Sequence, residues 1–200
     1  VCSSDLLINC MKIYVEAGAN DGIFQSRSLR FADDPDYFGI LIEPDPIMYQ
    51  QCVKTRPVRS RIYHAALVSR DYPKNTIDLL LHNSYSAMNS VYRADDNNYT
   101  GSVSVPARTL QSIFDENSIA EVEHIFLDTE GYEMEILKGI DFDRVRIHNL
   151  EVECHHQFLS TSEEQEVTRY VSFLRNTHEL KGIDRSDGLP KMNFRLKQSS

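Results

Sequence analysis

Several stretches of this sequence join an apolar run to glycines or acids, which is where α/β proteins place ligand-binding residues. Residues 13–22 read IYVEAGANDG, an apolar strand followed by a turn that contains Gly18, Asn20 and Gly22. Glycine and asparagine accept unusual backbone dihedrals, and glycine lets the backbone approach a ligand closely. We predict a ligand-binding loop here, then a helix that begins near Gly22 and points its first N–H groups at the ligand. The alternative is that the glycines only pack the strand against the helix.

A second apolar run, 37–43 (YFGILIE), ends in Glu43. Nucleotide-binding folds place an acid about 20 residues beyond the first turn, where it accepts hydrogen bonds from ribose hydroxyls. Glu43 is our candidate for that role. The alternative is that Glu43 only ends its strand, before a helix with Asp45 as N-cap and Pro46 at its first position.

An acidic turn follows a predicted fourth strand, 124–128. Asp128 and Glu130 stand on this turn, which Gly131 closes. Strands one and four are expected neighbours in such a sheet, so the two acids should lie beside the first loop. Asp128 is our candidate for contacting the ligand or a substrate hydroxyl, and Glu130 is a second candidate. The alternative for Glu130 is an acid at a helix N-terminus.

His155 follows a predicted fifth strand, 147–154, whose end faces the same crevice. An imidazole with a pKa of about 6.5 takes a proton from a hydroxyl readily at neutral pH, so His155 is our candidate general base. A zinc site made of Cys154, His155 and His156 is disfavoured, because adjacent ligands do not form a zinc spacing. We therefore predict no metal site.

The remaining patterns predict the scaffold. Residues 61–68 alternate as a third strand, with His64 as a packing or surface residue rather than a catalytic one. Ser162 and Gln165 form a capping box ahead of an amphipathic helix. Two short runs, 178–183 and 192–196, predict a C-terminal antiparallel hairpin.

An insertion interrupts the regular alternation between residues 72 and 106, which are rich in Asn, Ser, Tyr and Asp. Segments 77–82 and 101–105 are expected to pair as strands. The loop between them is predicted to act as a lid that brings Ser84, Ser86 or Asn89 over the ligand. The alternative is a solvated loop.

Six short motifs occur in order between residues 14 and 153: VEAGANDG, ILIEPDP, AALVS, VPARTLQSIF, IFLDTEGYEMEILKGI and LEVE. In this order and spacing the chain resembles the FkbM-type methyltransferases, which depend on S-adenosylmethionine. It departs from the family pattern at Glu16, where an Asp is commoner, and at Leu127 and Thr129.

The resemblance implies an α/β, Rossmann-like class I methyltransferase fold. Its seven-stranded, mostly parallel sheet would have the order 3-2-1-4-5-7-6 and end in the antiparallel hairpin. It also implies S-adenosylmethionine as cofactor, held by residues of the first turn, the ends of strands two and four, and the third strand. The cofactor-binding residues so expected are Glu16, Gly18, Ala19, Asn20, Gly22, Glu43, Pro44, Ala65 and Asp128.

Length and composition limit the other possibilities. The 200 residues are 41% hydrophobic, enough for one core, and we expect a single domain at 11–200 with residues 1–10 as a non-native or disordered leader. A formal charge of −9 argues against a nucleic-acid partner. The longest apolar runs fall short of a membrane span, and scattered cysteines without a secretory signal predict a cytoplasmic protein.

The resemblance further implies an enzyme that transfers a methyl group to a hydroxyl of a sugar or natural product, and we expect Asp128, Glu130 and His155 to be its catalytic residues. The expected partner is a small-molecule or glycan acceptor, and neither a nucleic acid nor a membrane. One alternative is a cofactor-binding module without catalytic activity. Another is a nicotinamide-dependent oxidoreductase, which is disfavoured because the first turn lacks the dinucleotide pattern.

Overall fold

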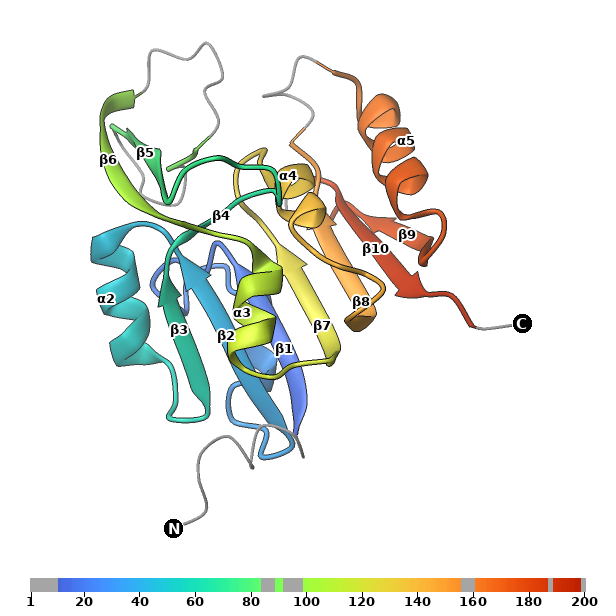
Figure 1. Cartoon of the computed structure of the whole chain (residues 1–200), viewed down its shortest axis with the longest axis horizontal. Helices are drawn as coiled ribbons and strands as arrows, with labels where there is room; N and C mark the ends of the chain where they lie inside the picture. Colours follow the sequence, from blue (N-terminus) through green and yellow to red (C-terminus); the bar gives the residue numbers. More distant parts are fainter. Residues whose placement is uncertain (1–10, 84–88, 92–98, 156–160, 187–188, 199–200) are drawn as a thin grey trace.

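Apolar runs of the sequence form a seven-stranded sheet in a computed structural model that describes residues 11–83, 89–91, 99–155, 161–186 and 189–198 (Figure 1). The predicted leader, 1–10, lies outside the described residues. The order of the sheet is β3-β2-β1-β7-β8-β10-β9. Its strands are β1 (Lys12–Ala17), β2 (Tyr37–Glu43), β3 (Ser60–His64), β7 (Glu121–Leu127), β8 (Arg146–Glu153), β9 (His178–Asp184) and β10 (Lys191–Leu196).

The first five strands of this sheet in chain order pair in parallel, and β10 pairs antiparallel with both β8 and β9. Numbered along the chain without the inserted strands, the order is 3-2-1-4-5-7-6. The predicted class I methyltransferase architecture with a C-terminal antiparallel hairpin is therefore confirmed.

Strand β1 is buried on both faces, as expected for the centre of a parallel sheet. Ile13 and Val15 belong to the main core, together with side chains of helices α3 (Leu110–Glu116), α4 (Glu133–Lys138) and α5 (Glu163–Leu174). Tyr14 faces the other way and packs with Cys52 of helix α2 (Pro46–Thr55). Figure 1 shows α3 and α4 in front of the sheet.

Local capping signals place the helix ends as the sequence predicts. The Asp45 side chain accepts hydrogen bonds from the N–H groups of Ile47 and Met48 at the start of α2. Ser162 and Gln165 form the predicted capping box of α5. These ends are fixed by side chains only a few residues from the groups they bind.

The helix predicted to begin near Gly22 is absent from the structure. Oδ1 of Asp21 accepts hydrogen bonds from the N–H groups of Ile23 and Phe24, as an N-cap does, but Gln25 has a left-handed φ of 54°. This backbone conformation does not continue a right-handed helix, and only a short 3-10 helix, η1 (Arg27–Phe31), follows. Ile23 and Phe24 are 52% and 56% exposed, so they lie outside the core.

The insertion forms a second sheet with the order β4-β6-β5. Strands β5 (Thr76–His82) and β6 (Tyr99–Arg108) pair antiparallel, with Ile77 opposite Val105, which confirms the predicted pairing. The predicted third strand is divided, because the main sheet keeps β3 only to His64 and β4 (Ala66–Leu67) pairs with β6. Ser84, Ser86 and His156 lie outside the described residues.

Within the part of the chain that the structure describes, no helix has the length and apolar character needed to cross a bilayer.

Candidate active site

A cavity of about 1000 Å³, which includes space open to solvent, lies at the carboxyl ends of β1, β2, β7 and β8. This is the crevice in which open α/β sheets bind their ligands. Most of the predicted site residues line it: Glu16, Gly18, Asn20, Glu43, Pro44, Ala65, Asp128 and Glu130. Ala19, Gly22 and His155 do not.

The turn after β1 has a left-handed backbone at Gly18, Asn20 and Gly22, with φ values of 83°, 49° and 84°. A Cβ at Gly18 would lie 1.8 Å from the carbonyl oxygen of Asp128, so only glycine fits where the turn crosses the end of β7. A Cβ at Gly22 would lie 2.7 Å from Oγ1 of Thr55. Gly22 therefore packs the turn on α2, and buried Ala19 joins the same packing cluster.

Glu43 connects the end of β2 to this turn. Its Oε2 accepts a hydrogen bond from the Asn20 N–H at 2.7 Å, and its Oε1 accepts one from the Asp45 N–H at 2.8 Å. Burial raises the pKa of Glu43 to about 7, although both N–H groups oppose the shift. Each carboxylate oxygen has a second lone pair, so Glu43 keeps the capacity to accept hydrogen bonds from a ligand in the cavity.

Glu16 lines the cavity and also has a structural role that was not predicted. Its carboxylate accepts hydrogen bonds from the Arg27 N–H, from the hydroxyls of Ser26 and Ser28, and from Arg56 at 3.0 Å. The carboxylate thus binds N–H groups at the start of η1, where we expected a ligand to sit. Glu16 borders the cavity but acts as an internal cap that shapes the turn.

Asp128, Glu130 and His155 come together as predicted, although the imidazole lies behind the cavity wall. The His155 side chain is 0% exposed. Its Nε2 lies 3.8 Å from Oδ1 of Asp128 and 3.1 Å from Oε2 of Glu153, and its Nδ1 lies 3.6 Å from Oε2 of Glu130. Asp128, Glu130 and Glu153 line the cavity and His155 does not. A ligand in the cavity would therefore contact these carboxylates, and the carboxylates in turn contact the imidazole.

The helix-acid alternative for Glu130 is not what the structure shows. Helix α4 begins at Glu133, and its first-turn acids are Glu133 and Glu135. Oε1 of Glu133 accepts hydrogen bonds from the N–H groups of Thr129 and Gly131, which holds the turn closed. Glu130 has a left-handed φ of 55°, and its side chain points toward His155.

Proton affinities in this cluster are strongly shifted. Burial raises the pKa values of Asp128 and Glu130 to about 7, and in Asp128 the neighbouring Glu153 adds to the rise. Burial would also raise the pKa of Glu153, but hydrogen bonds from His155, Asp128 and Lys191 lower it to about 2. Burial would lower the pKa of His155, but the surrounding carboxylates raise it well above its ordinary value.

Two cationic residues on the cavity wall were missed by the sequence reasoning. Nζ of Lys191 lies 3.0 Å from Oε1 of Glu153, and Nε of Arg27 lies 2.7 Å from Oε1 of Glu151. Lys191 is the first residue of β10 and stands opposite Glu153 in the register with β8. Only the pairing register of β8 and β10, which the sequence does not show, would have indicated Lys191 as a site residue.

The described part of the inserted segment contributes Asn89 and Val91 to the cavity wall. Nδ2 of Asn89 donates a hydrogen bond to Oδ2 of Asp45 at 2.7 Å, and Asn89 lines the cavity as expected of the predicted lid. The hydroxyl of Ser90 donates to the carbonyl oxygen of Glu130 at 3.0 Å. These two contacts tie the insertion to both sides of the crevice.

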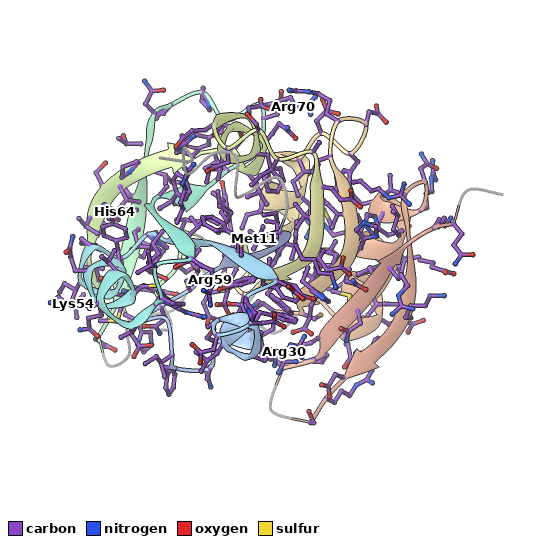
Figure 2. The ribbon with its side chains drawn as sticks, turned by 90° about the horizontal axis from the view of Figure 1, so that it is seen from below. Met11, Arg30, Lys54, Arg59, His64 and Arg70 are labelled. Carbon is purple, nitrogen blue, oxygen red and sulfur yellow. The ribbon has the colours of Figure 1, made fainter. Side chains whose placement is uncertain are left out.

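His64 is a packing residue, as predicted. Its ring stacks on Tyr49 of α2 with centroids 5.1 Å apart, and its Nε2 lies 3.0 Å from the carbonyl oxygen of Pro44. Figure 2 shows His64 on the α2 side of the molecule.

Known structures share this fold. A methyltransferase FkbM from Methylobacillus flagellatus KT matches with a TM-score of 0.57 and 18% identity over 92% of this chain and 43% of that one. TrmK from M. capricolum, in complex with the cofactor product S-adenosyl-homocysteine, matches with a TM-score of 0.50 and 8% identity over 98% of this chain and 67% of that one. The N-terminal domain of human METTL16, also in complex with SAH, matches with a TM-score of 0.50 and 10% identity over 98% and 65%.

Sequence identities this low show a shared fold and no more. The chain spans less than half of the Methylobacillus flagellatus protein. No curated protein sequence matches the chain. The methyltransferase FkbM domain, however, matches residues 16–181, which include the carboxyl ends of β1, β2, β7 and β8 at the cavity. The chain therefore belongs to the FkbM methyltransferase family.

Proposed function

We propose that this protein is an S-adenosylmethionine-dependent methyltransferase that methylates a hydroxyl of a sugar or natural product. The observation that carries the proposal is the single cavity wall formed by the Gly18–Asn20 turn, Glu43 and Asp128. This wall combines a tight turn suited to the amino-acid part of the cofactor, a carboxylate suited to its ribose, and acids suited to its sulfonium cation. Family membership argues against the nicotinamide-dependent alternative.

The chemistry of the cavity residues fits the cofactor. Gly18 and Asn20 would hold its amino-acid part, and Glu43 has free lone pairs for the ribose hydroxyls. Pro44 and Ala65 offer apolar wall on the adenine side. When bound, S-adenosylmethionine supplies a methyl group activated by a sulfonium sulfur, and the acids at the end of β7 complement that positive charge.

The residues of this chain would contribute alignment and proton transfer. Holding two reactants in attack geometry is worth about 7–11 kcal/mol. Asp128 and Glu130 face the cavity and are the carboxylates placed to accept the proton of the acceptor hydroxyl. His155 contacts both from behind the wall, so we assign it as a positioning residue that holds their charge and orientation.

Calorimetric titration of the purified protein with S-adenosylmethionine, S-adenosylhomocysteine and NAD tests the proposal. We expect saturable binding of the two sulfur compounds and none of NAD. Absence of binding by either sulfur compound would overturn the cofactor assignment. Binding without turnover across a panel of sugars and natural-product alcohols would instead favour the alternative of a cofactor-binding module without activity.

A further inference from the structure

Three side chains from two neighbouring strand ends converge at the floor of the cavity. Asp128 follows β7, Glu153 ends β8 and His155 lies two residues further, and their ligand atoms all lie within 4.8 Å of one another. Metal–ligand distances of about 2.0–2.3 Å place opposite ligand atoms about 4.0–4.6 Å apart. Against the expectation of no metal site, we propose that Asp128, Glu153 and His155 bind one divalent cation, which would also contact the acceptor.

An excess of buried negative charge supports this site independently of the three ligands. Glu133 is 1% exposed and brings Oε1 to 3.4 Å from Nε2 of His155. Its Oε2 is buried and has no hydrogen-bond partner among the described residues. Glu130 lies on the other side of the imidazole. Four carboxylates thus surround His155, and an imidazolium together with Lys191 would balance only two of them.

Buried carboxylates without matching cations are costly, and proteins relieve the cost with protons, paired cations or metal ions. Asp128 and Glu153 each bring a carboxylate oxygen within 4.8 Å of the other's. Two buried carboxylates at this distance repel each other unless a cation or a proton lies between them. A divalent cation at this point would neutralise the excess charge.

The arrangement is that of a catalytic metal site. Asp128 and Glu153 hold the cation from the cavity wall and His155 holds it from behind, so the coordination positions on the cavity side stay open. One imidazole nitrogen with two carboxylates suits a cation that accepts both nitrogen and oxygen, such as Mn²⁺. Lys191 Nζ contacts Oε1 of Glu153 and competes with the cation for that ligand.

This inference rests on the proposed function in one respect, the class of acceptor. An open metal position binds a hydroxyl oxygen and lowers its pKa, and a second open position favours acceptors with a neighbouring oxygen. Vicinal diols and hydroxy-carbonyl groups, both common in sugars, have this arrangement. Glu130 is not a ligand, so it remains the carboxylate that accepts the hydroxyl proton.

Calorimetric titration of the purified chain with Mn²⁺, in chelator-free buffer and without S-adenosylmethionine, tests the site. We expect saturable binding of one ion per chain. Asp128→Asn, Glu153→Gln and His155→Gln should each weaken it at least tenfold, whereas Glu164→Gln on the exposed face of α5 should not change it. Lys191→Met should tighten it, because Oε1 of Glu153 loses its ammonium partner; a purely structural role of the cluster predicts no such gain.

Circular dichroism of each variant shows whether it is folded, and Lys191→Met provides a second reading if a ligand variant unfolds. Absence of saturable Mn²⁺ binding, or binding that the three ligand variants leave unchanged, would overturn the site. A parallel titration with S-adenosylmethionine in EDTA separates the two proposals. Cofactor binding without Mn²⁺ binding removes the metal site alone, and Mn²⁺ binding without cofactor binding removes the proposed function alone.

Discussion

The Oε2 atom of Glu43 accepts a 2.7 Å hydrogen bond from the backbone N–H of Asn20. This bond joins the end of β2 to the turn after β1, so the acid proposed to bind the ribose also shapes the loop proposed to bind the amino-acid group. Glu43→Ala should therefore weaken S-adenosylmethionine binding at least tenfold, since hydrogen bonds to charged groups contribute about 1.5–3 kcal/mol. Calorimetry measures the affinity, and far-UV circular dichroism controls for the fold. An unchanged affinity would remove Glu43 from the ribose role.

The buried Glu43 also predicts a pH dependence of stability. Burial raises the pKa of Glu43 from 4.5 to about 7, with the nearby Asp45 and Glu16 carboxylates adding to the rise. The folded state thus holds this proton more tightly than the unfolded state. Its contribution to stability is complete below pH 4.5 and is lost as pH rises to about 7.

Urea denaturation of the wild type and Glu43→Gln measures this effect between about pH 4 and 8, a range that brackets the folded and unfolded pKa values. The amide of the variant cannot titrate, so the stability of the wild type relative to the variant should fall across that window. Parallel stability curves for the two proteins would contradict the assignment of the titration to Glu43.

The buried pair Arg56–Glu16 should be essential for stability. The Arg56 side chain is 0% exposed and bonds Glu16 and the Ser28 hydroxyl, each at 3.0 Å. Arg56→Met leaves Glu16 buried without its cation, which should cost about 3–5 kcal/mol of unfolding free energy. Arg59, exposed and labelled in Figure 2, gives the matched control, because Arg59→Met should change stability by less than about 0.5 kcal/mol. Comparable losses in the two variants, measured by urea denaturation, would argue against a role for the pair.

The turn after β1 should not tolerate a side chain at Gly18. A Cβ there would meet the Asp128 carbonyl oxygen at 1.8 Å, and the φ of +83° is unfavourable for alanine. Gly18→Ala should lower the unfolding free energy by at least about 2 kcal/mol. Gly101→Ala serves as the control, since no atom lies within 4 Å of its added Cβ. Thermal melts of equal midpoint for both variants would show that the turn can adapt.

His155→Gln should separate catalysis from cofactor binding once an acceptor has been identified. His155 contacts the carboxylates proposed to accept the proton but does not line the cavity, so cofactor affinity should be retained. Turnover should fall by up to about 10²–10⁴-fold, which is the usual contribution of the acid–base assistance that those carboxylates lose when His155 no longer positions them. Equal turnover in the variant and the wild type would leave the proton transfer to Glu130 and Asp128 alone.

Local signals in the sequence predicted a large part of the fold. The apolar runs at β1, β2, β7 and β8 indicated the parallel strands, since strands buried on both faces carry little polar interruption. Asp45 and Ser162 indicated helix starts because their side chains bind N–H groups two or three residues away. A cytoplasmic location and the identity of the acceptor remain predictions.

The candidate site was predictable where a residue's role depends on its position at a strand end. Glu43 and Asp128 line the cavity because parallel strands end at one edge of the sheet. The internal role of Glu16 was not predictable. It depends on Arg56 and on the serines of the η1 segment, which meet Glu16 only in the folded chain.

By itself the sequence determined the family motifs and the acids at the strand ends, because short-range patterns encode them, and the strand order followed from the resemblance to the family. Only the tertiary structure decided that Glu153 and Lys191 join the cluster of Asp128 and Glu130, and that His155 stands behind it with no exposed surface. The physical reason is register. Which residues of β7, β8 and β10 face one another is set by backbone pairing and core packing between segments far apart in the chain, and no local pattern specifies it.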